Sequence, residues 1–353
     1  MAADAGAAAG ILALPSPPAA ASRAVVKLSD GLIQSLAVGK VYRDHKGGGV
    51  SGLDFTHDGL HLVTSGEDNN VYVYSCDRAA RVKHLRCEKY GVRLIRFLHN
   101  DKDCAVAASR SETDHVLKYW DFQENKYLRL FRTHTARPRS LSPHPYEDIF
   151  LSGSVDKTVL LWDLRQDKPV AKINGEGPTF ASFDQQGLVF AASVGQPRLH
   201  LFDTRNYAKG EFTSFDLTTH LKGNNLVQGV QFSPCGKYLL VRSRGQLLLI
   251  DAFDGELICE YPVGEAGAGE TEGATPPPVP SFSPDSQYVM SGVPGGDVCV
   301  WATTNARLVH RLEGHTTTPG HVAFSPTHAL AVTAAETLAW WIPDSRRGPG
   351  QRA

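Results

Sequence analysis

The residues of this 353-residue sequence that could carry chemistry are its histidines, its carboxylates and a set of basic side chains. The six cysteines include no CxxC pair, and His45, His134, His220 and His315 recur at corresponding loop positions, where a structural role is sufficient. The carboxylates recur in the same way, and no phosphate-binding glycine loop, HExxH or GxSxG motif is present. We therefore predict a protein that is not an enzyme and that binds neither a metal nor a cofactor.

The basic side chains of interest lie in two predicted loop regions about 100 residues apart. They are Arg132, Arg137, Arg139 and Lys157 in the first region, and Arg242 and Arg244 in the second. A guanidinium group offers phosphate a planar fork of two N–H donors, so these six residues are candidate contacts for a phosphorylated or acidic peptide. The alternative is an ordinary solvated face with a few ion pairs.

An internal repeat determines how these side chains are positioned. A β-rich run that ends in an aromatic or large apolar residue recurs seven times, at intervals of 40 to 51 residues, ending at Tyr74, Trp120, Trp162, Phe202, Ile250, Trp301 and Trp341. Several of these runs are preceded by a strand–turn unit such as Val230–Gly236. Repeats of about 40–45 residues with four short strands each are typical of propellers, and the sequence predicts an all-β, seven-bladed WD40 β-propeller.

The third repeat contains the fullest set of residues that stabilise a WD repeat. Its similarity to such repeats assigns a structural hydrogen-bond network to His134, Ser152, Asp156 and Trp162. An Asp six residues before the anchor is also present in the first two repeats, but not in the fourth to seventh. We expect those later blades to be less rigid, or to depend mainly on apolar packing.

The propeller is expected to span 24–343, with Gln34–Tyr42 pairing with the last repeat to close the ring. Residues 1–23 are rich in Ala and Pro and predict a disordered leader, with a targeting peptide as the alternative. Residues 263–280 predict a flexible loop insertion, and 344–353 a polar tail.

The charge balance excludes two classes of partner. Lys and Arg number 36 and Asp and Glu 37, a net charge of −1, whereas bulk nucleic acid and anionic membranes select for basic proteins. The longest apolar runs, such as Leu247–Ile250, are far shorter than the roughly 20 residues that span a bilayer. We therefore predict no membrane partner and no direct sequence-specific binding of nucleic acid.

Several longer motifs point to one family of propellers. The stretches Lys89–Arg96 (KYGVRLIR), Leu151–Arg165 and Ile250–Gly255 (IDAFDG) closely resemble the Swd-two type of WD-repeat protein, the small propeller subunit of COMPASS-type histone H3 lysine methyltransferase complexes. The resemblance runs in order from about Leu28 to Asp344, roughly nine-tenths of the chain. Arg93 departs from the family pattern, in which an acidic residue is expected at this position.

The resemblance implies a non-catalytic scaffold subunit in the nucleus. Its implied partners are a SET-domain methyltransferase, the other COMPASS-like subunits, chromatin, and RNA polymerase II with serine-phosphorylated C-terminal repeats. The alternative is an adaptor of a protein phosphatase and mRNA 3′-end processing assembly that acts in transcription termination. A ubiquitin-ligase substrate receptor is a third possibility, but the sequence shows no ligase-docking feature. The implied polymerase partner favours the phosphopeptide interpretation of the basic residues.

Overall fold

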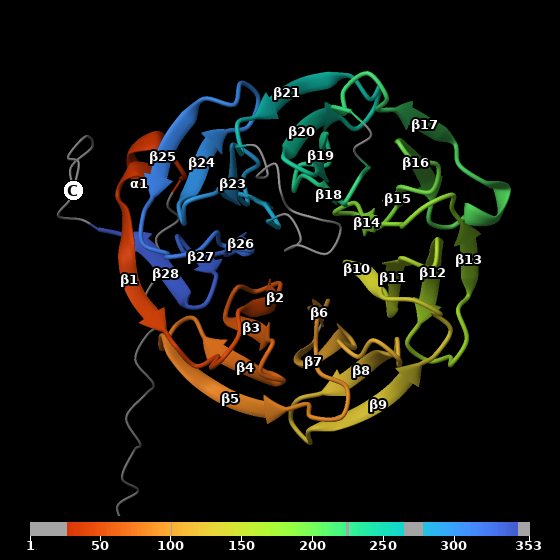
Figure 1. Cartoon of the computed structure of the whole chain (residues 1–353), viewed down its shortest axis with the longest axis horizontal. Helices are drawn as coiled ribbons and strands as arrows, with labels where there is room; N and C mark the ends of the chain where they lie inside the picture. The colour runs from red at the N-terminus through yellow and green to blue at the C-terminus, as the bar shows by residue number, and fades with distance from the viewer. Residues whose placement is uncertain (1–26, 100, 224–225, 265–277, 345–353) are drawn as a thin grey trace, which may run out of the picture.

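A computed structural model describes residues 27–99, 101–223, 226–264 and 278–344 of the chain. Within these residues, 28 strands form seven antiparallel four-stranded sheets arranged as a ring (Figure 1). The fold is the seven-bladed propeller predicted from the repeat. The expected leader, residues 265–277 of the expected insertion, and the expected tail beyond Asp344 lie outside the described residues.

Each blade is a meander whose strands follow one another outward from the axis of the ring. Blades 1 to 3 contain β2 (Val50–Phe55), β3 (His61–Gly66), β4 (Asn70–Ser75), β5 (Ala80–Arg86), β6 (Leu94–Leu98), β7 (Asp101–Ala108), β8 (Leu117–Asp121), β9 (Lys126–Phe131), β10 (Pro138–Pro143), β11 (Ile149–Ser154), β12 (Thr158–Asp163) and β13 (Ala171–Asn174). Blades 4 and 5 contain β14 (Ala181–Phe183), β15 (Val189–Ala192), β16 (Arg198–Asp203), β17 (Thr213–Asp216), β18 (Gly229–Phe232), β19 (Tyr238–Ser243), β20 (Gln246–Asp251) and β21 (Leu257–Tyr261), with the 3₁₀ turn η1 (Tyr207–Lys209) before β17. Blades 6 and 7 contain β22 (Ser281–Phe282), β23 (Tyr288–Gly292), β24 (Val298–Ala302), β25 (Leu308–Leu312), β26 (His321–Phe324), β27 (Ala331–Ala334) and β28 (Leu338–Pro343).

The core consists of seven apolar clusters, and each cluster lies between two neighbouring blades. Between blades 1 and 2, for example, Val63 and Val73 pack with Ile95 and Trp120. Because the middle strands of a blade are covered on both faces, they carry runs of apolar residues rather than alternation. All six residues of β12 are buried, whereas the rim strand β13 alternates between partly buried and exposed positions.

The N-terminal segment closes the ring as predicted. Strand β1 (Leu36–Tyr42) pairs antiparallel with β28 and supplies the fourth strand of blade 7, so this sheet contains the first and last strands of the chain. The short helix α1 (Asp30–Gln34) precedes it and lies beside blade 6 (Figure 1). Ile33 of α1 is fully buried, and the Asp30 carboxylate lies 2.6 Å from the Arg307 guanidinium.

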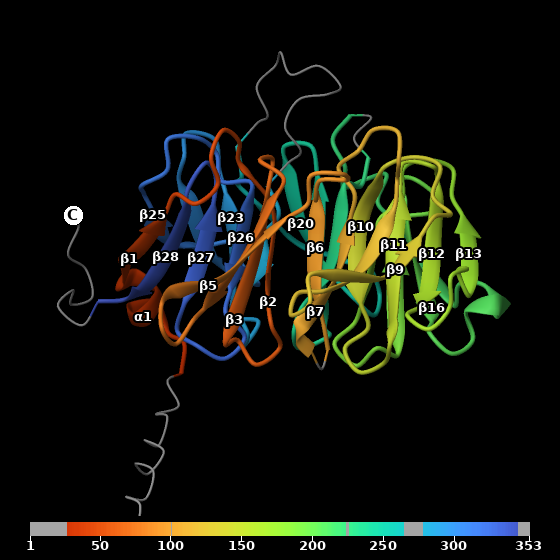
Figure 2. The same cartoon turned by 90° about the horizontal axis from the view of Figure 1, so that it is seen from below.

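The meander places the connections of each blade on two opposite faces, which Figure 2 shows edge-on. The segments that join one blade to the next emerge on the same face as the turns between second and third strands. This face carries His134 and Asp156, and we call it the His134 face.

Candidate functional site

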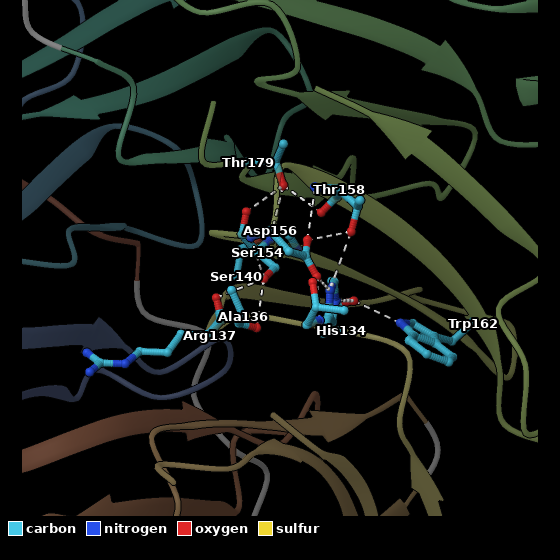
Figure 3. Close-up of polar contacts among 12 residues, drawn as sticks. His134, Ala136, Arg137, Ser140, Ser154, Asp156, Thr158, Trp162 and Thr179 are labelled. Atoms are coloured by element: carbon cyan, nitrogen blue, oxygen red, sulfur yellow. Dashed lines mark hydrogen bonds and ion pairs between the residues drawn. The ribbon is translucent and has the colours of Figure 1, made fainter. Parts of the chain in front are cut away.

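The four residues assigned to the network of blade 3 are joined by hydrogen bonds (Figure 3). His134 Nδ1 lies 2.7 Å from Asp156 Oδ2, and His134 Nε2 lies 2.7 Å from Ser152 Oγ. The indole N–H of Trp162 donates to the same Ser152 Oγ at 2.8 Å. The side chains of His134, Ser152 and Trp162 are buried, so the network satisfies polar groups that would otherwise each cost about 1–3 kcal/mol.

Asp156 connects this network to the turn between β11 and β12. Its carboxylate accepts hydrogen bonds from the backbone N–H groups of Thr135 and Thr158, both at 3.0 Å, and from the Thr158 hydroxyl at 2.6 Å. Burial alone would raise the pKa of Asp156, but the hydrogen bonds from His134 and Thr158 outweigh burial and hold it well below its ordinary value. Asp156 is therefore ionised, and its carboxylate stabilises the turn and the network of blade 3.

Thr179 extends the polar contacts of blade 3 to the segment that leads into blade 4 (Figure 3). Its hydroxyl donates to the Thr158 carbonyl at 2.6 Å and accepts from the Ser154 N–H at 3.0 Å. Because Thr179 is fully buried, these bonds fix the relative position of the two blades as well as the turn itself.

Two other blades keep part of the network. In blade 1, His45 contacts Asp68 at 3.0 Å and Thr64 at 2.9 Å. In blade 7, the Thr333 hydroxyl contacts His315 at 2.6 Å and accepts from the Trp341 indole at 2.8 Å. Blade 7 therefore retains the His–Thr–Trp contacts although Ala335 occupies the position of the turn Asp.

Blade 2 replaces the network with a buried lysine. The Nζ of Lys118 donates to the Gly91 carbonyl at 2.8 Å and to Cys87 Sγ at 3.0 Å, and it lies over the rings of Tyr90 and Tyr127. Burial lowers the pKa of Lys118, and interactions with Cys87, Tyr90 and Asp114 compensate in part. Asp114, which has the sequence position of Asp156, instead pairs with Arg132.

Among the described residues, no group of three or more His, Cys, Asp or Glu side chains is arranged to hold a metal ion. The described helices include none that is long and apolar enough to cross a membrane.

The structure distributes the six predicted basic residues over different surroundings. Arg132 lies 3.0 Å from Asp114, and Arg137 pairs with Glu112, so both are matched by carboxylates of blade 2. Lys157 is exposed in the β11–β12 turn, where it adopts a positive φ of 65°. Figure 3 shows the Arg137 side chain extending away from the His134–Trp162 network. The remaining residues are Arg139 and Arg244, which are exposed on the His134 face, and Arg242, which is partly buried.

Arg139 and Arg242 lie near two arginines outside the predicted set, Arg93 and Arg96. Burial, and then the charges of Arg139 and Arg96, lower the pKa of Arg242 to about 10. Burial, and then the charges of Arg139 and Arg137, lower the pKa of Arg93. We call Arg93, Arg96, Arg139 and Arg242 the axial arginine cluster, because their side chains come from blades 2, 3 and 5 and interact across the inner part of the ring.

Two backbone contacts show how the deeper members are held. The Nη1 of Arg96, on the innermost strand β6, donates to the Leu53 carbonyl of neighbouring blade 1 at 2.9 Å. The Nη2 of Arg242, on β19, donates to the Gln228 carbonyl at 2.7 Å. A Cβ on Gly229 would lie only 2.8 Å from Arg242 Nε, so this glycine of β18 leaves room for the guanidinium over the strand nearest the axis.

The sequence contained a signal for the two arginines that were missed. Arg93 and Arg96 both belong to the KYGVRLIR stretch, whose Tyr90 and Gly91 contact the buried Lys118. One short motif therefore supplies both a structural contact and half of the axial arginine cluster. Its spacing to Arg139 and Arg242 along the chain gives no indication that these side chains meet.

Comparison with known proteins identifies relatives along nearly the whole chain. The family model described as WD domain, G-beta repeat, matches residues 37–75 and 125–163. WD repeat-containing protein 82 of Drosophila melanogaster is 34% identical over 92% of this chain and 99% of its own length. COMPASS component SWD2 of Saccharomyces cerevisiae is 31% identical over 84% of this chain and 92% of its own length. The Set1 complex component swd2 of Schizosaccharomyces pombe is 27% identical over 84% of this chain.

Proposed function

Since this chain belongs to the Swd2 family of WD-repeat proteins, we propose that it is a scaffold subunit of a nuclear COMPASS-like histone H3 lysine methyltransferase complex. The observation that carries the proposal is the similarity to the yeast COMPASS component over 92% of that protein's length. A non-catalytic role agrees with the chemistry of the described residues, because the polar side chains of blades 1, 3 and 7 serve the fold. The partners of such a subunit would be a SET-domain methyltransferase and the other COMPASS-like subunits.

The scaffold would connect the methyltransferase to transcribing RNA polymerase II and so to chromatin. The ligand in this part of the proposal is a polymerase C-terminal repeat peptide phosphorylated on serine. Basic residues at the start of blade 3 support it, because Arg137 and Arg139 lie on the His134 face and guanidinium groups bind phosphate through paired N–H donors.

Affinity purification of the tagged full-length chain from nuclear extract, with quantitative mass spectrometry, tests the first part. We expect a SET-domain methyltransferase and its core subunits to co-purify in near-equal amounts. Recovery of phosphatase and 3′-end-processing subunits without the methyltransferase would contradict the proposal and favour the termination adaptor instead.

Peptide binding tests the second part. The double variant Arg137→Glu and Arg139→Glu should bind the serine-phosphorylated repeat peptide at least about tenfold more weakly, because two charge-assisted contacts become repulsive. Arg78→Glu is the matched control, since Arg78 is exposed in the β4–β5 turn on the opposite face. Equal affinity of the double variant and the wild type would remove these arginines from the peptide site.

A further inference from the structure

The axial arginine cluster carries an inference that goes beyond membership of a complex. Its side chains approach from several directions: Arg93 and Arg96 from blade 2, Arg139 from blade 3 and Arg242 from blade 5. His321, the first residue of the inner strand β26 in blade 7, lies within reach of the charges of Arg96 and Arg242. The inner strands of these blades surround the axis in Figure 1.

Two carboxylates balance the cluster in part: the charge of Glu67 acts on Arg93, and Asp54 acts on Arg96. Arg93, Arg96 and Arg139 form no ion pair with a carboxylate of the described residues, in contrast to Arg132 and Arg137 beside them. Asp54 lies within reach of the charge of Arg96, and its Oδ2 accepts the Phe97 N–H at 2.8 Å. Burial raises the pKa of Asp54 to about 6 despite the opposing charge of Arg96, so this carboxylate is mostly ionised at neutral pH and balances one charge of the cluster.

Arg93, Arg96 and Arg242 are partly buried, and buried like charges are costly unless opposite charge lies among them. The arrangement also limits the form of that anion. An extended peptide in a groove meets donors in a row, whereas these donors come from separate blades around a common axis. A compact ligand with phosphate groups pointing in several directions matches donors of this kind. Each phosphate can accept two parallel N–H hydrogen bonds from one guanidinium group.

We propose that the axial arginine cluster is a binding site for a compact small-molecule polyphosphate, of the chemical class of the inositol polyphosphates. Arg93, Arg96, Arg139 and Arg242 contact its phosphates, and His321 supplies a neutral hydrogen-bonding group at the same level of the ring. The bound ligand connects four blades across the axis, so it stabilises the closed ring as well as neutralising the cluster. The site requires none of the partners of the proposed function.

The experiment uses the purified full-length chain and myo-inositol hexakisphosphate as the probe, with isothermal titration calorimetry and thermal denaturation at physiological salt. We expect one site per chain and a rise in the melting temperature with ligand concentration. The variant Arg93→Gln with Arg139→Gln is preferred, since neither side chain makes a hydrogen bond within the described residues whose loss could unfold the ring. It should weaken binding by at least about tenfold.

Arg78→Gln serves as the control for general electrostatic attraction and should keep the wild-type affinity within about twofold. Inositol hexasulfate, which carries sulfate groups in place of phosphate groups, is titrated for comparison. Absence of both heat and thermal shift at saturating hexakisphosphate would overturn the proposal. Equal weakening in Arg78→Gln would also overturn it, since it would indicate unspecific attraction.

The same titrations separate this inference from the peptide site of the proposed function. Binding of the hexakisphosphate without binding of the phosphorylated peptide would support the polyphosphate site and count against the peptide assignment. Binding of the peptide alone, lost in Arg93→Gln with Arg139→Gln, would assign the cluster to the peptide and overturn the polyphosphate proposal.

Discussion

At the scale of single residues, the hydrogen bonds of Asp156 are the most concentrated in blade 3. Its carboxylate forms a hydrogen bond with His134 and accepts three more, from two backbone N–H groups and from the Thr158 hydroxyl. We expect Asp156→Ala to lower the free energy of unfolding by about 3 kcal/mol, because several buried donors lose their acceptor together. Urea denaturation would measure this, with the exposed Glu124→Ala as control, expected within about 0.5 kcal/mol of wild type. Equal midpoints for the two variants would contradict the structural role.

His321 and Asp54 predict opposite effects of pH on stability. Burial, and then the charges of Arg96 and Arg242, lower the pKa of His321 from an ordinary 6.5 to about 3. The unfolded chain therefore takes up a proton between about pH 6.5 and 3 that the folded chain does not, and stability falls as the pH is lowered. For Asp54 the folded pKa of about 6 lies above the ordinary 3.8, so its contribution is present at low pH and is lost as the pH rises through 6.

These signs can be tested with one variant of each residue. His321→Gln should make the loss of stability between pH 6.5 and 4 shallower than in wild type, whereas Asp54→Asn should make it steeper. Chemical denaturation at a series of pH values gives both slopes. If the two variants changed the slope in the same direction, the assignment of at least one pKa shift would be wrong.

At the scale of elements, strand β1 is the closure of the ring. It pairs with β28 from Leu36 to Tyr42, and α1 anchors it through the buried Ile33. A chain that begins at Arg43 should lose much of its thermal stability, because blade 7 is left with three strands and an open edge. A chain that begins at Arg23 retains every described contact and should melt like the full-length protein. Melting temperatures from circular dichroism would decide, and identical values for both truncations would contradict the closure role.

The turns between second and third strands differ in how well their N–H groups are bonded. In blade 3, the N–H groups from Val155 to Thr158 all donate within the turn or to the adjoining loop. In blade 6, Gly295 and Gly296 adopt φ values of 98° and 97°, and among the described residues their N–H groups have no acceptor. Hydrogen exchange should therefore be at least about tenfold faster in the blade 6 turn. Equal protection of the two turns would contradict the expectation that the later blades are less rigid.

At the scale of the whole molecule, every blade has two neighbours, because the first and last strands meet in one sheet. An open array of repeats has terminal units that fray, but a closed ring with a cluster at each of its seven junctions has none. We expect a single calorimetric unfolding transition, shifted as a unit by Asp156→Ala. Two separated transitions would show that the blades unfold as independent groups.

Much of this architecture could be predicted from the sequence because its signals are local. The seven anchors from Tyr74 to Trp341 lie on third strands, and the apolar runs that end in them reflect the burial of these strands between blades. The network of blade 3 could be assigned because its four residues lie within 29 positions of one another. Lys118 was not anticipated, since its partners Cys87 and Gly91 belong to the preceding inter-blade segment and follow no repeat pattern.

The sequence by itself determined the repeat, the number of blades, the closing strand and the family, because each depends on patterns within a few tens of residues. Only the tertiary structure decided which basic residues belong together. Arg132 and Arg137 pair with carboxylates of blade 2, while Arg93 and Arg96 join Arg139 and Arg242 from distant repeats. The physical reason is that electrostatic interactions depend on distance in space, and a closed ring brings side chains about 150 residues apart in the chain to one axis.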